Sequence, residues 1–198
     1  QVSKNLEIIA EVGLAHEGSL GMAHSYIDSL YSSGIDFIKF QIHIAEEEST
    51  LEEPFRINFS YEDKTRYEYW KRTQFDFDQW KQIKKHCDTK GIKFLASPFS
   101  LKALEWIELL GLDTIKVGSA DVQNPILMHR LSQMNSRLIL STGLSSDDEI
   151  KESTDKILNS SIEMDFLYCV SKYPTSPTDI SLNRIKTLSN LFPKSKVG

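Results

Sequence analysis

The chain alternates from end to end between short β-rich runs and amphipathic helical stretches. Strict alternation of this kind is typical of a parallel sheet whose strands are joined by helical crossovers, so the sequence predicts an α/β fold. The expected strands span residues 6–12, 37–41, 93–97, 114–117, 138–141 and 166–170, with a seventh beginning near Lys196. The expected helices span residues 22–32, 77–90, 101–110, 125–134, 146–159 and 180–191. Gly34, Gly91 and Gly111 stand where three of these helices should end.

The expected strands share a second pattern. On each of them the apolar residues lie on one face, and the opposite face has a polar residue at the C-terminal end of the strand. In residues 37–41 the polar Lys39 and Gln41 share one face, and Lys116 is isolated in the same way within residues 114–117. In a (β/α)8 barrel one strand face meets the helices, the other lines the interior, and the active site lies at the C-terminal mouth. No G-x-G-x-x-G motif follows the first strand, which removes the usual sign of a dinucleotide-binding sheet. We therefore predict a TIM barrel, covered here to about six and a half βα units.

Polar side chains at the strand ends are the expected active-site residues. Two lysines in a mostly enclosed cleft need anions to neutralise them, and a small substrate with a phosphate and a carboxylate would serve. Two alternatives remain open: a salt bridge within the barrel wall, with Glu11 as a partner of Lys39, or a lysine that forms a Schiff base. The pattern brings to one mouth Glu11, Lys39, Gln41, Ser97, Lys116, Ser119 and Ser141.

Three other features bear on the mouth. Residues 42–75 are too long for an ordinary strand-to-helix loop and are rich in charged and aromatic residues, which favours a functional lid or a partner contact. His43 lies just past the second strand on the interior parity, so we expect it among the polar mouth residues. His16 precedes a glycine-containing turn and is expected to line the mouth.

Composition excludes several classes of partner. The net charge is −5 with no basic cluster, which argues against nucleic acid. No apolar run approaches the roughly 18 residues that span a bilayer, and no signal pattern appears at the start, so we expect no membrane contact and a cytoplasmic location. Cys87 and Cys169 lack metal-type spacing, and no H-E-x-x-H motif occurs.

Seven short motifs, in order along nearly the whole chain, resemble the sialic acid synthase family, which includes relatives that make legionaminic and pseudaminic acids. They are IIAEVG at 8–13, HEG at 16–18, KFQ at 39–41, SPF at 97–99, KVGS at 116–119, ILSTG at 139–143 and CVSKYP at 169–174. The resemblance implies that phosphoenolpyruvate, an N-acetylated amino-hexose and water give a nine-carbon 2-keto acid and phosphate. The amino-hexose would be N-acetylmannosamine or a diacetylated 6-deoxy analogue.

The resemblance also implies a role for each matching position. Asp121 takes the place of an acid that is commonly Glu, and Asp121 and Glu11 are the expected catalytic residues. The expected carboxylate contacts of phosphoenolpyruvate are Lys39, Ser97 and Ser119, and the phosphate contacts are Lys116, Ser141 and Ser171. The sugar is expected to lie against Glu11, Gln41 and Tyr173, with Phe99 as a wall of its pocket.

The resemblance further implies parts that lie outside these residues. A divalent metal, Mn²⁺ or Mg²⁺, is expected, with two histidine ligands beyond residue 198, so no metal ligand is assigned here. Residues 1–198 are expected to be an incomplete N-terminal catalytic barrel, without the end of the barrel and the small C-terminal antifreeze-like domain of a domain-swapped homodimer. Two alternatives of other classes are a catalytically inactive barrel that acts as a binding or structural subunit, and a Schiff-base aldolase of the N-acetylneuraminate lyase type.

Overall fold

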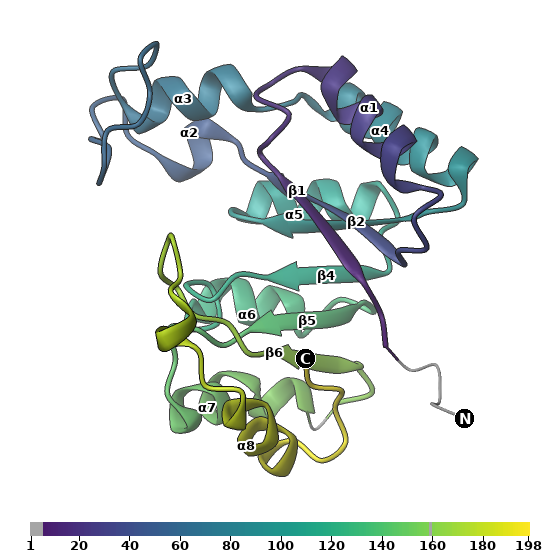
Figure 1. Ribbon diagram of the computed structural model, residues 1–198, viewed down its shortest axis with the longest axis vertical. Coiled ribbons are helices and arrows are strands. Elements are labelled where there is room, and N and C mark those ends of the chain that lie inside the picture. The colour runs from purple at the N-terminus through teal and green to yellow at the C-terminus, as the bar shows by residue number, and fades with distance from the viewer. Residues whose placement is uncertain (1–5, 159) are drawn as a thin grey trace. The chain divides into compact units, whose positions relative to one another are not determined.

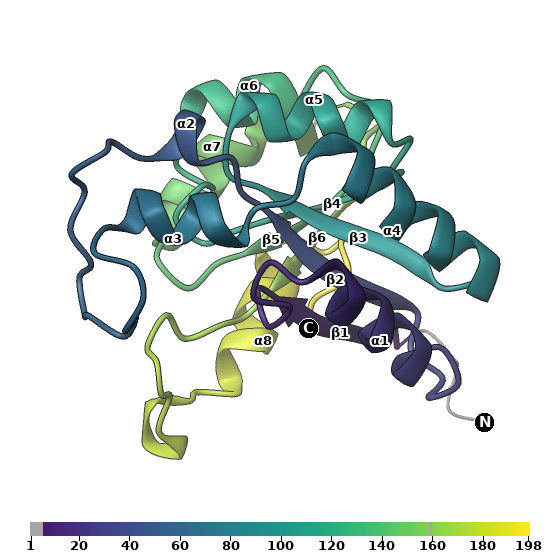
Figure 2. The ribbon, with the colours of Figure 1, turned by 90° about the horizontal axis from the view of Figure 1, so that it is seen from above.

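A computed structural model describes residues 6–158 and 160–198. The described residues fall into two compact units that divide after residue 112. Each unit contains three parallel strands in chain order, with helices between them (Figures 1 and 2). The predicted α/β fold is therefore confirmed.

The first unit is built on strands β1 (Ile9–Gly13), β2 (Phe37–Ile42) and β3 (Lys93–Pro98). In the register of β1 and β2, Glu11 lies opposite Lys39, and in that of β2 and β3, Gln41 lies opposite Ser97. The helices of this unit are α1 (Leu20–Leu30), α2 (Ala45–Glu48), α3 (Arg66–Thr73), α4 (Phe77–Lys90) and α5 (Leu101–Leu109).

Burial along β2 explains why this strand forms the centre of the first unit. Five of its six residues are buried, which is typical of a parallel strand covered on both faces. Helix α4 buries Trp80, Ile83 and Cys87, spaced three and four residues apart, so they form one stripe along the helix. Helix α1 runs beside α4 (Figure 1) and buries Ala23 and Ile27.

Helix ends in this unit follow from local hydrogen bonding. Asp76 accepts the backbone N–H of Gln79, whose side chain accepts the N–H of Asp76, and this capping box starts α4. The helix ends at Gly91, whose φ of +71° is the left-handed conformation that glycine adopts without strain. The expected stop at Gly91 is therefore confirmed.

The long segment between β2 and α4 has more structure than we predicted. We define residues 43–76 as the β2–α4 segment. Instead of a loop, it contains α2 and α3, and Thr65 and Glu68 form the capping box that starts α3. The segment is thus a small ordered substructure at the carboxyl end of β2.

The second unit is built on strands β4 (Thr114–Val117), β5 (Arg137–Ser141) and β6 (Met164–Leu167). Lys116 lies opposite Ile139 in the register of β4 and β5, and Ser141 lies opposite Leu167 in that of β5 and β6. Its helices are α6 (Pro125–Leu131), α7 (Asp147–Leu158), the 3₁₀ turn η1 (Pro177–Asp179) and α8 (Asn183–Leu191).

Several predicted boundaries in the second unit were wrong. Strand β6 spans Met164–Leu167 rather than residues 166–170, and both the N–H and the hydroxyl of Thr142, directly after β5, donate to the carbonyl of its last residue, Leu167. Helix α8 begins later than residue 180, because Ser176 starts the separate turn η1. The strand expected near Lys196 is a single parallel bridge between Phe166 and Val197.

Among the described residues, no helix is both long and apolar enough to span a membrane.

Candidate active site

An ion pair joins the middle of β1 to the middle of β2 in the first unit. The Nζ atom of Lys39 lies 2.9 Å from Oε2 of Glu11, the residue opposite it in the register. The Lys39 side chain is only 5% exposed, whereas that of Glu11 is 58% exposed. The salt bridge that the sequence left open as an alternative is therefore present. The carboxylate of Glu11 therefore reaches solvent while it pairs with the buried lysine.

Three further predicted residues lie in the same unit. The Oε1 atom of Gln41 lies 3.7 Å from the position that a Cβ atom would occupy at Gly13, so its amide covers the end of β1. Ser97 is 2% exposed at the end of β3. Phe99 directly follows β3 and is half-buried, with its ring stacked on His43.

The second unit holds a separate lysine-centred cluster at the ends of β4 and β5. Lys116 is 6% exposed, and its ammonium group donates to the carbonyl of Val117 at 3.1 Å and to the hydroxyl of Ser141. This places a buried ammonium group near the carboxyl end of β4, beside the last residue of β5.

A second group of polar atoms surrounds Gly143, two residues after β5. The hydroxyl of Ser119 accepts the N–H of Gly143 at 3.1 Å and lies 3.3 Å from Sγ of Cys169. A Cβ atom at Gly143 would lie 2.6 Å from Oγ of Ser171 and 2.9 Å from the Cys169 carbonyl. Only glycine therefore allows this close approach, which brings Ser119 and Ser171 to the same turn.

The two remaining predicted residues lie on loops of the second unit. Asp121 ends a turn after β4, in which its N–H donates to the carbonyl of Gly118 at 3.0 Å, and it is half-buried. Tyr173 is 95% exposed in the segment after β6. The structure thus places Asp121 beside the strand ends, whereas Tyr173 extends into solvent.

The prediction that His16 lines the mouth was wrong, because its ring is 1% exposed. It stacks on Phe75 with ring centroids 4.4 Å apart, next to Trp80. Burial, with a smaller contribution from the charge of His43, lowers the pKa of His16 to about 4. His16 is therefore a neutral core residue.

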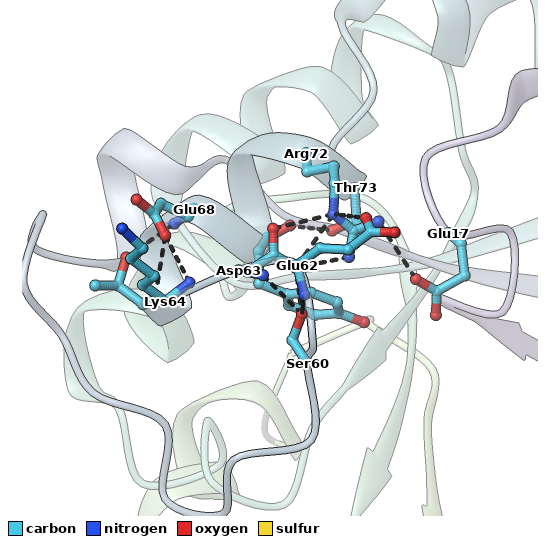
Figure 3. Close-up of polar contacts among 10 residues, drawn as sticks. Glu17, Ser60, Glu62, Asp63, Lys64, Glu68, Arg72 and Thr73 are labelled. Atoms are coloured by element: carbon cyan, nitrogen blue, oxygen red, sulfur yellow. Dashed lines mark hydrogen bonds and ion pairs between the residues drawn. The ribbon is translucent and has the colours of Figure 1, made fainter.

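The β2–α4 segment is held to the turn between β1 and α1 by a charged cluster. Arg72 of α3 donates from Nε and from its terminal nitrogen to the carboxylate of Asp63, and it lies 3.6 Å from both Glu17 and Glu62 (Figure 3). The hydrogen bond from Arg72 is the main cause that lowers the pKa of Asp63. This segment, expected as a lid or a partner contact, is thus fixed to the loop that follows Glu11.

Two observations concern other candidate sites. A groove of about 470 Å³ runs between α6 and α7, lined by residues such as Met128, His129 and Glu149, and it contains none of the predicted site residues. Among residues 6–158 and 160–198, no three His, Cys, Asp or Glu side chains lie together in a way that could hold a metal ion.

Sequence reasoning identified the two lysines and the serines but missed their neighbours. Cys169 shares the parity of Ser171 in the chain, so the strand pattern could have suggested it. Only one feature of the sequence pointed to the contact of His43 with Glu48, namely the position of His43 directly after β2.

These features define an α/β protein with buried lysines on its parallel strands and polar side chains where those strands end. Comparison with known proteins then assigns the family. The NeuB family profile matches residues 26–198, and the chain belongs to the NeuB family. The resemblance to sialic acid synthases is therefore confirmed.

Relatives with assigned names agree with this membership. The chain is 27% identical to N,N'-diacetyllegionaminic acid synthase of Campylobacter jejuni, over 98% of this chain and 60% of that protein. It is 30% identical to human N-acetylneuraminate-9-phosphate synthase, over 96% of this chain and 54% of that protein. The chain thus spans little more than half the length of these relatives.

A solved structure shows the same fold. The N-acetylneuraminic acid synthetase of Leptospira borgpetersenii, in complex with citrate, matches with a TM-score of 0.83 and 27% identity, over 96% of this chain and 63% of that one.

Proposed function

We propose that this chain is the substrate-binding part of a sialic-acid-type synthase, which condenses phosphoenolpyruvate with an N-acetylated amino-hexose. The observation that carries the proposal is the buried Lys116–Ser141 contact at the strand ends of a NeuB-family chain. A buried ammonium group beside hydroxyl donors matches the phosphate of phosphoenolpyruvate in charge and in hydrogen bonding. The named synthases among the relatives support the same reaction.

In the proposed reaction, C3 of the enol forms a bond to the aldehyde carbon of the sugar. Water adds to C2, phosphate leaves, and the product is a nine-carbon 2-keto acid. In the second unit, Lys116, Ser141 and Ser171 hold the phosphate, Ser119 supplies a hydroxyl for the carboxylate, and Asp121 moves a proton. Tyr173 would close on the sugar from its exposed position.

In the first unit, Lys39 and Ser97 bind the carboxylate of phosphoenolpyruvate. The sugar is bound by Glu11, Gln41 and Phe99, and Glu11 is the second catalytic candidate. The exposed carboxylate of Glu11 is free on its solvent side to accept from a sugar hydroxyl while it remains paired with Lys39.

Three further parts of the proposal concern the whole protein. The α/β units belong to a (β/α)8 barrel, a view supported by the match to the Leptospira synthetase. The protein forms a domain-swapped homodimer. A divalent metal would stabilise the developing alkoxide when bound, and its two histidine ligands are proposed to lie beyond residue 198.

The test uses the full-length protein with manganese, phosphoenolpyruvate and a panel of amino-hexoses that includes N-acetylmannosamine and a diacetylated 6-deoxy analogue. We expect a nine-carbon 2-keto acid by mass spectrometry with at least one acceptor. No product with any acceptor would favour an inactive barrel instead.

Borohydride trapping separates the synthase from the aldolase. A Schiff-base aldolase is trapped covalently by borohydride in the presence of its substrate, because reduction fixes the imine on the lysine. We expect no mass increase on the protein, and a stable adduct on Lys39 or Lys116 would contradict the proposed reaction.

A further inference from the structure

Three aromatic rings form a continuous stack in the first unit. The imidazole of His43 lies nearly parallel to the indole of Trp70, with ring centroids 4.0 Å apart and an interplanar angle of 6°. Its other face lies against Phe99, at 4.2 Å and 12°. Because Trp70 belongs to α3 and Phe99 follows β3, the stack joins the β2–α4 segment to the end of β3.

A buried hydrogen bond fixes the middle ring of this stack. His43 is 4% exposed, and its Nδ1 lies 2.7 Å from Oε2 of Glu48, whose side chain is 9% exposed. The other oxygen of Glu48 accepts the N–H of Ile44 at 2.7 Å. Because a carboxylate only accepts, Nδ1 of His43 carries the hydrogen. The imidazole therefore has no freedom to turn in its plane without breaking this bond.

The outer ring of the stack is also held in place. Helix α3, which carries Trp70, is anchored by the contacts of Arg72 with Asp63 and Glu17 (Figure 3). At its C-terminal end, Oε1 of Gln74 accepts the N–H of Ala45 at 2.8 Å. Two of the three rings thus have fixed partners besides each other, whereas the ring contacts described for Phe99 are with His43 alone.

We propose that His43 is a positioning residue, which holds the ring of Phe99 through the stack and so sets the wall against which the amino-sugar binds. The inference rests on the proposed function, because it takes Phe99 as the wall of the sugar pocket. The chemical class recognised at this wall is the acylated amino-hexose. Phosphoenolpyruvate, assigned to the lysines and serines, does not depend on the stack.

Steady-state kinetics of the full-length protein test the proposal. His43→Ala removes the middle ring, and we expect the KM for the amino-sugar to rise about tenfold while that for phosphoenolpyruvate stays within about twofold. His43→Phe restores a flat ring without the hydrogen bond to Glu48, and it should recover most of the loss. The matched control is Phe75→Leu, which removes an equally buried ring that stacks on His16 instead. An equal rise in both KM values for His43→Ala, or the same split for Phe75→Leu, would overturn the positioning role.

Crystal structures of the two His43 variants separate this proposal from the proposed function. We expect the Phe99 ring to move in His43→Ala and to return in His43→Phe. If Phe99 keeps its position in His43→Ala, the positioning role is wrong, whatever the activity. If the unaltered protein uses no amino-sugar, the proposed function fails, while the movement of Phe99 still decides the role of His43.

Discussion

At the residue scale, His16 shows how strongly the core of the first unit selects a neutral side chain. Its Nδ1 accepts the N–H of Gly18 at 3.1 Å, so the hydrogen of the neutral ring lies on Nε2. Within the described part of the chain, Nε2 of His16 and Nε1 of Trp80 are the buried side-chain nitrogens or oxygens without a hydrogen-bond partner. Leaving a buried donor unpaired costs about 1–3 kcal/mol. Burial of these two N–H groups therefore already lowers the stability of the folded state before His16 takes up a proton.

The pKa of His16 gives a prediction about pH. Because the pKa is about 4 in the folded protein and about 6.5 when unfolded, the unfolded state binds the proton first as the pH falls. Stability should therefore be full above pH 6.5 and decline towards pH 4, with a loss of about 2 kcal/mol from this residue at pH 5. His16→Phe should reduce the pH dependence of the unfolding free energy, measured in urea at pH 7.5 and 5. His129→Gln, at an exposed position, is the control and should leave it unchanged. An unchanged pH dependence in His16→Phe would contradict this assignment.

Lys116 carries the prediction about the phosphate. In the full-length protein, Lys116→Ala should raise the KM for phosphoenolpyruvate ten- to a hundredfold, since a charge-assisted contact contributes about 1.5–3 kcal/mol. The KM for the sugar should change far less. Lys102→Ala, which removes an exposed lysine paired with Glu105 on α5, is the matched control. An unchanged KM for phosphoenolpyruvate in Lys116→Ala would show that Lys116 does not bind the phosphate.

Asp121 is predicted to move a proton. Asp121→Asn should lower kcat about a hundredfold or more and leave phosphoenolpyruvate binding nearly intact, because the amide keeps the shape but neither gives nor takes a proton readily. Asp121→Glu should keep substantial activity. Equal activity of the Asn variant and the parent would show that Asp121 only caps the turn after β4.

The strand pattern could predict the strand face of a candidate site residue but not its contacts, and the reason is physical. Parity along a strand determines which face a side chain occupies, so Lys39 and Lys116 could be assigned from the sequence. It does not determine what each side chain meets, so the Glu11 pairing remained an open alternative. His43 and Glu48 meet through the folding of the β2–α4 segment, for which no periodicity exists.

At the element scale, the helices were predicted more reliably than the segments between them. Helix α4 was predicted at its observed bounds with Gly91 as its stop, and the structure adds a capping box and a buried stripe that agree with those bounds. Helix α3 was not predicted, because its tyrosines and tryptophan are spread among charged residues and gave no apolar stripe. Its position depends instead on distant contacts, such as that of Arg72 with Glu17.

The contact between the β1–α1 turn and α3 gives a prediction at this scale. Gly18 has a φ of +76°, and a Cβ atom there would lie 2.5 Å from the carbonyl oxygen of Arg72, a backbone atom that cannot easily move. Gly18→Ala should lower the unfolding free energy by about 2–4 kcal/mol, since it adds this clash to the conformational cost. Gly34→Ala is the matched control, with a φ of +80° and no atom within 4 Å of the added Cβ, and it should lose only about 1–2 kcal/mol. Equal losses of unfolding free energy in the two variants, measured by urea unfolding, would show that the turn does not pack against α3.

At the scale of the whole molecule, the net charge of −5 does not describe the surroundings of single buried residues. In the first unit Lys39 is nearly buried and paired with Glu11, and in the second unit Lys116 is nearly buried beside Ser141. The sequence excluded nucleic acid from the overall charge and indicated a small anion from the two lysines. The acceptor sugar was not predictable, because the strand pattern carries no information about the loops, in which we propose that its selectivity lies.

We propose that the enzyme consumes phosphoenolpyruvate only as it joins it to an amino-sugar. The most direct measurement follows inorganic phosphate and 2-keto acid product together, in the full-length protein with manganese and the preferred acceptor, and repeats the reaction with pyruvate in place of phosphoenolpyruvate. We predict one phosphate for each product molecule, no phosphate without the sugar, and no product from pyruvate. Phosphate release without the sugar, or product from pyruvate, would contradict the account.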